Sequence, residues 1–307
     1  MKPIIELRNV SKKIRNKQII DNLSFEVMAG EVLGFLGPNG AGKTTTIRMI
    51  TGLMKVSSGE IIINGTNLKQ DFEKAISQIG AIVENPELYK FLTGYENLMQ
   101  AARLYKGVTK EKINQVVEMV GLKDHIHNKV KTYSLGMRQR LGIALCLLHD
   151  PKVLILDEPT NGLDPAGIKE IRHYLRKLAH ENNLAILVSS HLLSEMEMMC
   201  DRIAIIQNGK LVNIQRVKEE EEEVKTRPYF IQVDKITSAL NILQDAGYEA
   251  NPHEHGIEVY LEKKQVPEII QQFVQQNILI YEVKVISKSL EDRFLEITND
   301  KAVTSHA

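Results

Sequence analysis

At residues 37–44 the chain reads Gly37-Pro38-Asn39-Gly40-Ala41-Gly42-Lys43-Thr44. This stretch matches the pattern G-x-x-x-x-G-K-[ST], in which glycines let successive backbone N–H groups turn toward phosphate oxygens. In such a loop Lys43 can reach the β- and γ-phosphates of a nucleotide, and the Thr44 hydroxyl can bind Mg²⁺. The segment therefore predicts a phosphate-binding loop, with an ordinary glycine-rich turn as the alternative.

The sequence on both sides of this loop fits phosphate binding. Residues 31–36 form a short apolar run typical of a buried strand, and residues 45–50, from Thr45 onward, read as an opening helix. The phosphates would then meet the positive end of a helix dipole. A glycine turn without a nucleotide would not need the strand, the lysine and the threonine together, so we expect a bound nucleotide along residues 37–45.

A second apolar segment, residues 153–156, ends in two adjacent carboxylates, Asp157 and Glu158. Because the segment is apolar on both faces, it predicts an interior strand. Asp157 at its carboxyl end would complete the Mg²⁺ shell. Glu158 points to the other side and would orient and deprotonate a water that attacks the γ-phosphate. Adjacent acids can be mere solubility features, but the specific loop at residues 159–164 argues against this.

Five motifs occur in an order that resembles the ATP-binding-cassette (ABC) ATPases. They are residues 37–44, 134–140, 154–160, 162–164 and 189–191. The resemblance covers about residues 4–215 and implies an α/β fold: a P-loop cassette with a mixed sheet and a helical subdomain at about residues 90–150. It also implies that ATP and Mg²⁺ are the cofactors. In this family ATP lies between two cassettes arranged head to tail, so a second copy of the cassette is an expected partner.

The resemblance also implies roles for residues outside the phosphate loop. Ser134 and Gly136 of one cassette would touch the γ-phosphate bound by the other, and Asp164 would lie at the cassette interface. His191 would hydrogen-bond the γ-phosphate and steady the attacking water. The residues themselves agree for Ser134, which can cap a helix through residues 138–148 and leave its N–H groups free for an anion.

The sequence departs from the family pattern at several positions. Glu84 stands where a glutamine normally meets Mg²⁺ and the water, and we expect a carboxylate there to bind Mg²⁺ more strongly. Ile14 replaces the aromatic residue that usually stacks on adenine, which predicts tolerant base selection and modest ATP affinity. Glu84, together with Leu135 and Met137 in the segment at 134–140, resembles the branch that protects bacteria from lantibiotics and bacitracin.

The composition sets limits on the partners. Lys+Arg and Asp+Glu both count 39 in 307 residues, so zero net charge gives no sign of nucleic-acid binding. The two cysteines, Cys146 and Cys200, have no spacing typical of metal ligands and are expected to be reduced packing residues. No apolar run approaches the roughly 20 residues that span a bilayer. We therefore expect a protein that is soluble by itself and sits peripherally at the cytoplasmic face of the membrane through a partner.

The composition changes after residue 217, which predicts a cassette at 1–217, a charged linker at 218–227 and a small domain at 228–307. The run of five glutamates at 219–223 is expected to be a solvated face of the linker. The expected strands and helices of the small domain follow the order βαββαβ, which suggests a ferredoxin-like α+β sandwich. They are residues 229–234, 236–246, 248–252, 257–262 (with a hairpin around Gly256), 266–276 and 278–286, before a last helix from about 289. His253 and His255 are expected to be surface residues.

The function predicted from these motifs is that of an ATP-hydrolysing subunit that energises a separate membrane permease for peptide-antibiotic export or resistance. Drug or ion efflux is an alternative, as is a non-transport ABC ATPase acting on ribosome or DNA, although the chain has neither a long coiled-coil insertion nor two fused cassettes. A P-loop kinase or GTPase would leave residues 134–137 and His191 without a role. Tyr89, Phe91 and Tyr95, beside a helical insert at 94–124, are candidate permease contacts or equally core residues.

Overall fold

The computed structural model describes residues 2–217 and 226–286, which fall into two compact units, Met1–Val217 and Lys218–Ala307. Each unit has its own apolar core. The glutamate run at 219–223 and the expected helix from 289 lie outside the described residues.

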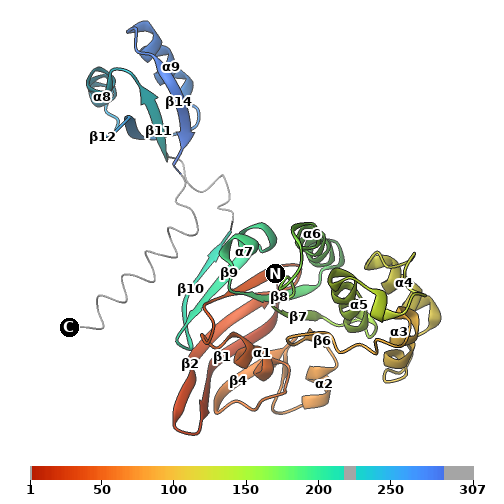
Figure 1. The fold of residues 1–307 in the computed structure, drawn as a ribbon. Helices are drawn as coiled ribbons and strands as arrows, with labels where there is room; N and C mark the ends of the chain where they lie inside the picture. Colours follow the sequence, from red (N-terminus) through yellow and green to blue (C-terminus); the bar gives the residue numbers. More distant parts are fainter. Residues whose placement is uncertain (1, 218–225, 287–307) are drawn as a thin grey trace. The chain divides into compact units, whose positions relative to one another are not determined.

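A six-stranded sheet forms the centre of the first unit (Figure 1). Its order is β10 (Lys210–Arg216), β9 (Arg202–Gln207), β3 (Val32–Leu36), β8 (Ala185–Ser190), β7 (Val153–Asp157) and β6 (Ile79–Ile82). All neighbours pair in parallel except β9 and β10. Every residue of β3, β7 and β8 is buried, and for β3 and β7 this confirms the prediction from the apolar runs at 31–36 and 153–156. Because the strands from β9 to β6 run in parallel, the loops after them meet at one edge.

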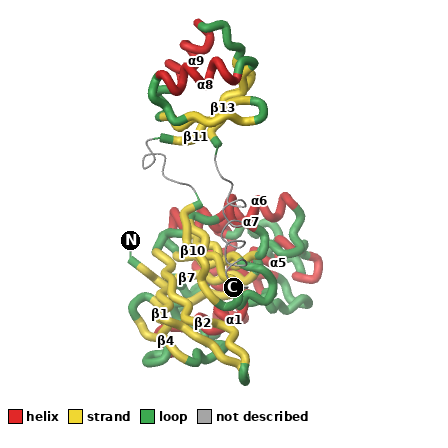
Figure 2. Tube along the Cα trace, turned by 90° about the vertical axis from the view of Figure 1, so that its left-hand side faces the viewer, coloured by secondary structure: helices red, strands yellow, loops and turns green. Residues whose placement is uncertain are grey.

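A second, antiparallel sheet was not predicted from the sequence. Its order is β2 (Lys17–Met28), β1 (Pro3–Ile14), β4 (Ser58–Ile63) and β5 (Thr66–Asn67). Figure 2 shows β1, β2 and β4 side by side at one end of the unit. Burial alternates along much of β2, as in a strand with one face on the core, and such strands lack the continuous apolar run of β3 or β7. The expected mixed sheet is therefore present, but the cassette also contains this additional antiparallel sheet.

The helices of the first unit surround the larger sheet. They are α1 (Lys43–Ile50), α2 (Phe72–Ile76), α3 (Gly94–Ala102), α4 (Lys110–Met119), α5 (Leu135–Leu147), α6 (Pro165–Asn182) and α7 (Leu193–Met199), with a 3-10 turn at Val130–Thr132. Helices α3, α4 and α5 gather beside the β6 edge (Figure 1). The helical insert predicted at 94–124 is thus two helices, α3 and α4, and Leu104, which follows α3, is exposed.

Helix α5 packs on β6 through glycines that leave no room for a side chain. A Cβ atom at Gly80 would lie 2.8 Å from the Cβ atom of Cys146, and one at Gly142 would lie 2.6 Å from the Cβ atom of Pro86. Contacts under 3 Å are closer than packed carbons allow, so both positions need glycine. This packing fixes the loop that follows β6 against α5.

The second unit is a four-stranded sheet with both helices on one face (Figure 2). In chain order the elements are β11 (Arg227–Val233), α8 (Ile236–Asp245), β12 (Ala250–His253), β13 (Gly256–Leu261), α9 (Val266–Gln275) and β14 (Ile280–Val285). The sheet order is β12-β13-β11-β14, and all neighbours are antiparallel. The hairpin turn is at Glu254 and His255, and Gly256 already begins β13. His253 and His255 are exposed, as expected.

Among the described residues, no helix combines the length and the apolar character that crossing a bilayer requires.

Candidate functional site

The loop at residues 37–42 wraps the start of α1 and depends on its glycines. Gly40 and Gly42 have φ values of +81° and +110°, a region that suits glycine. A Cβ atom at Gly37 would come within 2.4 Å of the Ile206 carbonyl oxygen. Gly42 gives no side-chain cap to α1, so the first N–H groups of that helix remain available to an anion.

Lys43 is the first residue of α1, and its side chain is only 5% exposed. Its Nζ donates to the carbonyl oxygens of Gly37 at 2.8 Å and Pro38 at 3.4 Å. The same Nζ lies 3.5 Å from Glu158 Oε1. The ammonium is therefore held inside the loop, where phosphate oxygens would meet a positive charge with little competing water.

Asp157 and Glu158 end β7 in different environments. Asp157 is buried, and its Oδ1 accepts a hydrogen bond from Ser189 Oγ at 2.5 Å. Glu158 has a left-handed backbone with φ of +50°, and its N–H donates to Ser189 Oγ at 3.0 Å. A positive φ is uncommon for a residue with a side chain, and such conformations concentrate at functional sites.

His191, just past β8, is paired directly with Glu158. Its Nδ1 lies 2.9 Å from Glu158 Oε2. The side chain of His191 is 38% exposed and that of Glu158 is 24% exposed, so both can be reached from solvent. The structure thus brings together two residues that lie 33 positions apart and that the sequence predicted to act on the same water.

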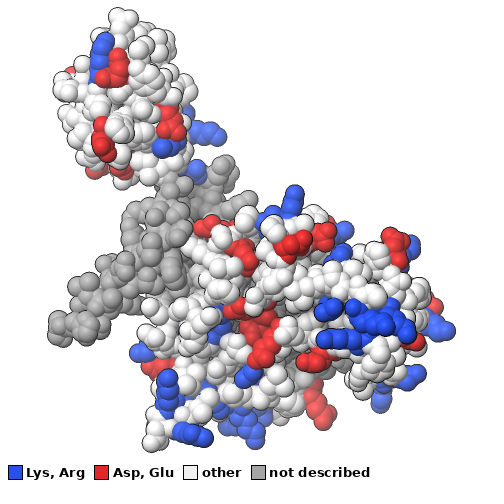
Figure 3. Space-filling model, in the orientation of Figure 1, with Lys and Arg blue, Asp and Glu red and all other residues white. Residues whose placement is uncertain are grey.

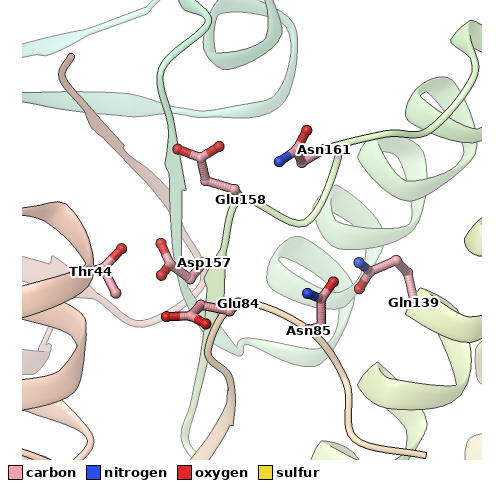
Figure 4. A pocket seen from close by; sticks show the side chains of 7 residues that line it. All are labelled: Thr44, Glu84, Asn85, Gln139, Asp157, Glu158 and Asn161. Atoms are coloured by element: carbon pink, nitrogen blue, oxygen red, sulfur yellow. The ribbon is translucent and has the colours of Figure 1, made fainter. Parts of the chain in front are cut away.

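A pocket of about 210 Å³ opens between α1, the ends of β6 and β7, and α5. It is lined by Thr44, Glu84, Asn85, Gln139, Asp157, Glu158 and Asn161 (Figure 4). The carboxylates of Glu84, Asp157 and Glu158 point toward the side of Thr44 (Figure 4). The three residues predicted to hold Mg²⁺, which are Thr44, Glu84 and Asp157, therefore share one pocket. Hydroxyl and carboxylate oxygens are suitable ligands for this ion.

Glu84 has a partner that the sequence did not reveal. Its Oε1 lies 2.5 Å from Nη2 of Arg48, in the last turn of α1, and its backbone φ is +69°. Both side chains are substantially exposed. A contact between residues 36 positions apart has no local sequence signal.

Three pocket residues were also missed by the sequence analysis. Asn85 adjoins Glu84, and Asn161 follows the carboxylates by a few residues. Gln139 is 2% exposed, and its Oε1 has no hydrogen-bond partner within the described part of the chain. The available signal was a glutamine two residues before the apolar run that starts at Leu141, a position where a polar side chain can be drawn into the core.

The residues expected to act on a partner's nucleotide lie apart from this pocket. Ser134 caps α5, and its Oγ accepts from the Met137 N–H at 3.2 Å, as predicted. Asp164 caps α6 and accepts from the Gly167 N–H at 3.0 Å. Neither residue lines the pocket around Glu158. The segments that carry Ser134 and Asp164 lie close to each other, since a Cβ atom built at Gly162 would be 3.2 Å from Leu135 Cδ2.

The surface around the site is divided by charge. Figure 3 shows Asp and Glu side chains gathered near the centre of this face and Lys and Arg side chains gathered over α5. Arg138 and Arg140 belong to this helix. The remaining expected groups play no part in the pocket: Ile14 is 42% exposed on β1, and both cysteines are buried, which raises the pKa of the Cys146 thiol to about 12.

Comparison with known proteins gives consistent matches. The family model described as "ABC transporter" matches residues 20–161. The uncharacterized ABC transporter ATP-binding protein YhcH of Bacillus subtilis is 62% identical over the whole of both chains. The bacitracin transport ATP-binding protein BcrA of Bacillus licheniformis is 40% identical over 97% of this chain and 98% of its own. A solved structure described as "Structure of ATP binding subunit of ABC transporter" is 31% identical, with a TM-score of 0.62 over 69% of this chain and 90% of that one.

Proposed function

Because this chain belongs to the ATP-binding proteins of ABC transporters and is an ATPase of that family, we propose that it energises a separate membrane permease for peptide antibiotics. The observation that carries the proposal is the similarity to a bacitracin transport protein, which extends over 97% of this chain. A cassette alone is shared by transporters of many substrates, whereas this similarity also includes the second unit. The substrate class is therefore bacitracin-like or lantibiotic-like peptides, exported or removed from the membrane.

In the proposed hydrolysis step, Glu158 is the base and His191 its partner. Water attacks the γ-phosphorus, its proton passes to Glu158, and the bond from the γ-phosphorus to the β–γ bridging oxygen breaks, releasing ADP and phosphate. The contact of 2.9 Å between His191 Nδ1 and Glu158 Oε2 supports this pairing. Because Nδ1 is engaged in this contact, Nε2 is the His191 nitrogen that would hydrogen-bond a γ-phosphate oxygen. Lys43, with its ammonium held within the loop, neutralises charge on the phosphates.

Oxygen atoms around the pocket fit a Mg²⁺ ion. Thr44 Oγ1 and the carboxylates of Asp157 and Glu84 would hold it, and the ion would neutralise negative charge on the β- and γ-phosphates. Asp157 accepts a hydrogen bond from Ser189, which fixes the orientation of its carboxylate before any ligand binds.

We further propose that each nucleotide is gripped by two copies of the chain. The support is geometric, because Ser134 and Asp164, which cap α5 and α6, lie outside the pocket that Thr44 and Glu158 line. The N-terminus of α5 and Gly136 would supply N–H groups to the phosphate bound by the other copy. Closure of the pair on binding ATP, and its reopening after hydrolysis, would drive the permease.

Complementation tests this shared arrangement. Lys43→Ala removes the ammonium from one half of a site, and Ser134→Glu places a negative charge where the other half should meet phosphate. Each variant alone should be inactive, but their equimolar mixture contains pairs with one intact site, formed by Lys43 of one copy and Ser134 of the other. Restored phosphate release supports the arrangement, and a mixture as inactive as its components contradicts it.

The permease is proposed to dock beside α3. Tyr89 and Phe91 are 57% and 68% exposed, and the centroids of their rings lie 5.9 Å apart. Exposed aromatic residues of this kind are enriched at protein interfaces. Tyr95 is less exposed and contacts the ring of His127, which favours a packing role for this residue. The docked protein would lie at the cytoplasmic face of the membrane.

For the chain outside the cassette we propose a charged linker at 218–227 and a ferredoxin-like domain from 228 onward. The support is the order βαββαβ with an antiparallel sheet in the order β12-β13-β11-β14. No group of three or more His, Cys, Asp or Glu side chains that could hold a metal ion occurs among residues 2–217 and 226–286.

Deletion of the gene tests the substrate class. The deletion strain should become more sensitive to bacitracin or a lantibiotic, and wild-type protein should restore growth while Glu158→Gln should not. Unchanged sensitivity to these peptides, with altered tolerance of unrelated drugs or of ions, would move the assignment to drug or ion efflux. Association of the purified chain with ribosomes or DNA instead of a membrane partner would oppose transport.

A further inference from the structure

Glu195, on α7, joins the two loops that carry Glu158 and His191. Its Oε2 accepts a hydrogen bond from Thr160 Oγ1 at 2.6 Å and a second from Ser190 Oγ at 3.3 Å. Thr160 is 4% exposed and Ser190 is 2% exposed, so both hydroxyls are buried and need an acceptor. One carboxylate oxygen therefore connects the loop after β7 to the end of β8.

The position of Glu195 makes this connection informative. Glu195 is the third residue of α7, a position from which a glutamate can reach back to the N–H of the residue that caps its helix. Here the Leu192 N–H donates instead to Ser190 Oγ at 3.0 Å. The Glu195 carboxylate is thus directed away from its own helix and toward the two loops. A role limited to stabilising α7 would not require this arrangement.

Backbone pairing between the two loops ends just before the residues that need alignment. The ladder between β7 and β8 ends at the pair Asp157 and Ser189. One more backbone bond follows, from the Glu158 N–H to the Ser189 carbonyl oxygen at 3.2 Å. Beyond it, the described contacts that join the loops are made by side chains, namely Glu158 to His191 and Glu195 to its two hydroxyls.

We infer that Glu195 is a positioning residue for ATP hydrolysis, which keeps Glu158 and His191 at hydrogen-bonding distance as nucleotide binds and leaves. Thr160 follows Glu158 by two residues, and Ser190 immediately precedes His191. A carboxylate can accept from both hydroxyls at once, with bonds strengthened by its charge. This inference rests on the roles proposed for Glu158 and His191, and Glu195 itself does not contact the reacting atoms.

The test uses the full chain with Glu195→Gln, Thr160→Val and Ser190→Ala, and Glu197→Gln as the matched control. Glu197 lies on the same helix and makes no hydrogen bond or ion pair within the described residues. Misalignment by a fraction of an ångström should lower kcat for ATP by roughly 10-fold to 100-fold in Glu195→Gln. The affinity for a fluorescent ATP analogue, TNP-ATP, should change less than about 3-fold, because Glu195 does not line the phosphate loop. Thr160→Val and Ser190→Ala, which each remove one hydroxyl, should show smaller losses of kcat.

A double-variant comparison separates positioning from general stability. In a Glu158→Gln background the base is already absent, so adding Glu195→Gln should cause little further loss of residual hydrolysis. Equal losses of kcat in Glu195→Gln and Glu197→Gln, or a parallel loss of TNP-ATP binding, would overturn the inference. An additive loss in the double variant would also overturn it. If Glu158→Gln itself hydrolyses ATP at the wild-type rate, the proposed base is wrong; if it is inactive while Glu195→Gln is fully active, only the positioning role fails.

Discussion

Arg48 Nη2 lies 2.5 Å from Glu84 Oε1, so the positive charge of Arg48 neutralises this carboxylate. Arg48 belongs to α1, the helix that follows the phosphate loop, and Glu84 stands where the resemblance implies a glutamine. The two side chains are 41% and 61% exposed. Ion pairs with such exposure contribute about 1 kcal/mol or less to stability. Glu84 can therefore leave Arg48 at little cost, so its carboxylate remains available to the Mg²⁺ ion that we propose for the adjoining pocket.

Competition between Arg48 and Mg²⁺ for Glu84 can be measured. Arg48→Met frees the carboxylate and should lower the Mg²⁺ concentration that gives half-maximal ATP hydrolysis, whereas Glu84→Gln should raise it by several-fold. Basal turnover at saturating Mg²⁺ should survive in Glu84→Gln better than stimulation by the permease. The control is Arg103→Met, an exposed arginine outside the pocket. Identical Mg²⁺ titrations for all three variants would contradict the exchange.

Lys43→Ala should abolish nucleotide binding at concentrations that saturate the wild-type protein. The lost charge-assisted contacts correspond to about 3 kcal/mol, or roughly 100-fold in affinity. TNP-ATP fluorescence measures the change directly. Lys69→Ala, which removes an exposed lysine outside the phosphate loop, serves as the control and should bind TNP-ATP normally. Retained binding in Lys43→Ala would mean that the loop glycines alone hold the phosphates.

Glu158→Gln should keep ATP binding and slow hydrolysis by roughly 10²-fold to 10⁴-fold, because the amide cannot take a proton from water. The same variant should accumulate as an ATP-bound pair of chains, which size-exclusion chromatography with light scattering can detect. Its matched control is Glu170→Gln, whose carboxylate contacts Arg140 on the surface. A strictly monomeric Glu158→Gln protein with ATP and Mg²⁺ would contradict the shared site.

His149 predicts a pH dependence of stability. Desolvation by burial lowers the pKa of His149 in the folded chain. Its Nε2 contacts the Ile79 carbonyl oxygen, and its ring stacks on that of Tyr105 with the ring centroids 4.5 Å apart. The unfolded chain therefore binds the proton first as pH falls through about 6.5, and the stability conferred by the neutral ring is lost below that pH.

Thermal unfolding between pH 7.5 and 5.5 checks this expectation. The wild-type Tm should fall with decreasing pH, and His149→Phe should flatten this dependence while losing about 1 kcal/mol at neutral pH through the missing contact. His173→Gln, at an exposed position on α6, should leave the pH dependence unchanged. A slope in His149→Phe as steep as in the wild type would assign the effect to other groups.

The parts of the fold that the sequence predicted well are those with local signals. The loop at 37–44, the buried strand before Asp157 and the cap at Ser134 each depend on a few adjacent residues, and the structure contains all three. The βαββαβ order was likewise visible in short alternating segments. The strands β1 and β2 were missed, because burial on one face leaves no continuous apolar run.

Contacts between distant residues explain what else the sequence could not provide. Arg48 meets Glu84 across 36 positions, and Thr160 meets Glu195 across 35. Gln139 lines the pocket, and the glycines at 80 and 142 allow its helix α5 to lie close to β6 and the loop after it. Such pairs depend on the strand order of the sheet, which no local pattern specifies.

Gly142 has a mechanical consequence, because its α-carbon rests against Pro86 with no space for even a methyl group. A shift of α5 toward this proline would therefore displace Pro86 and, with it, the neighbouring Glu84. If the permease docks beside α3 as proposed, movement of the outer helices would therefore change the position of Glu84, which we propose as a Mg²⁺ ligand.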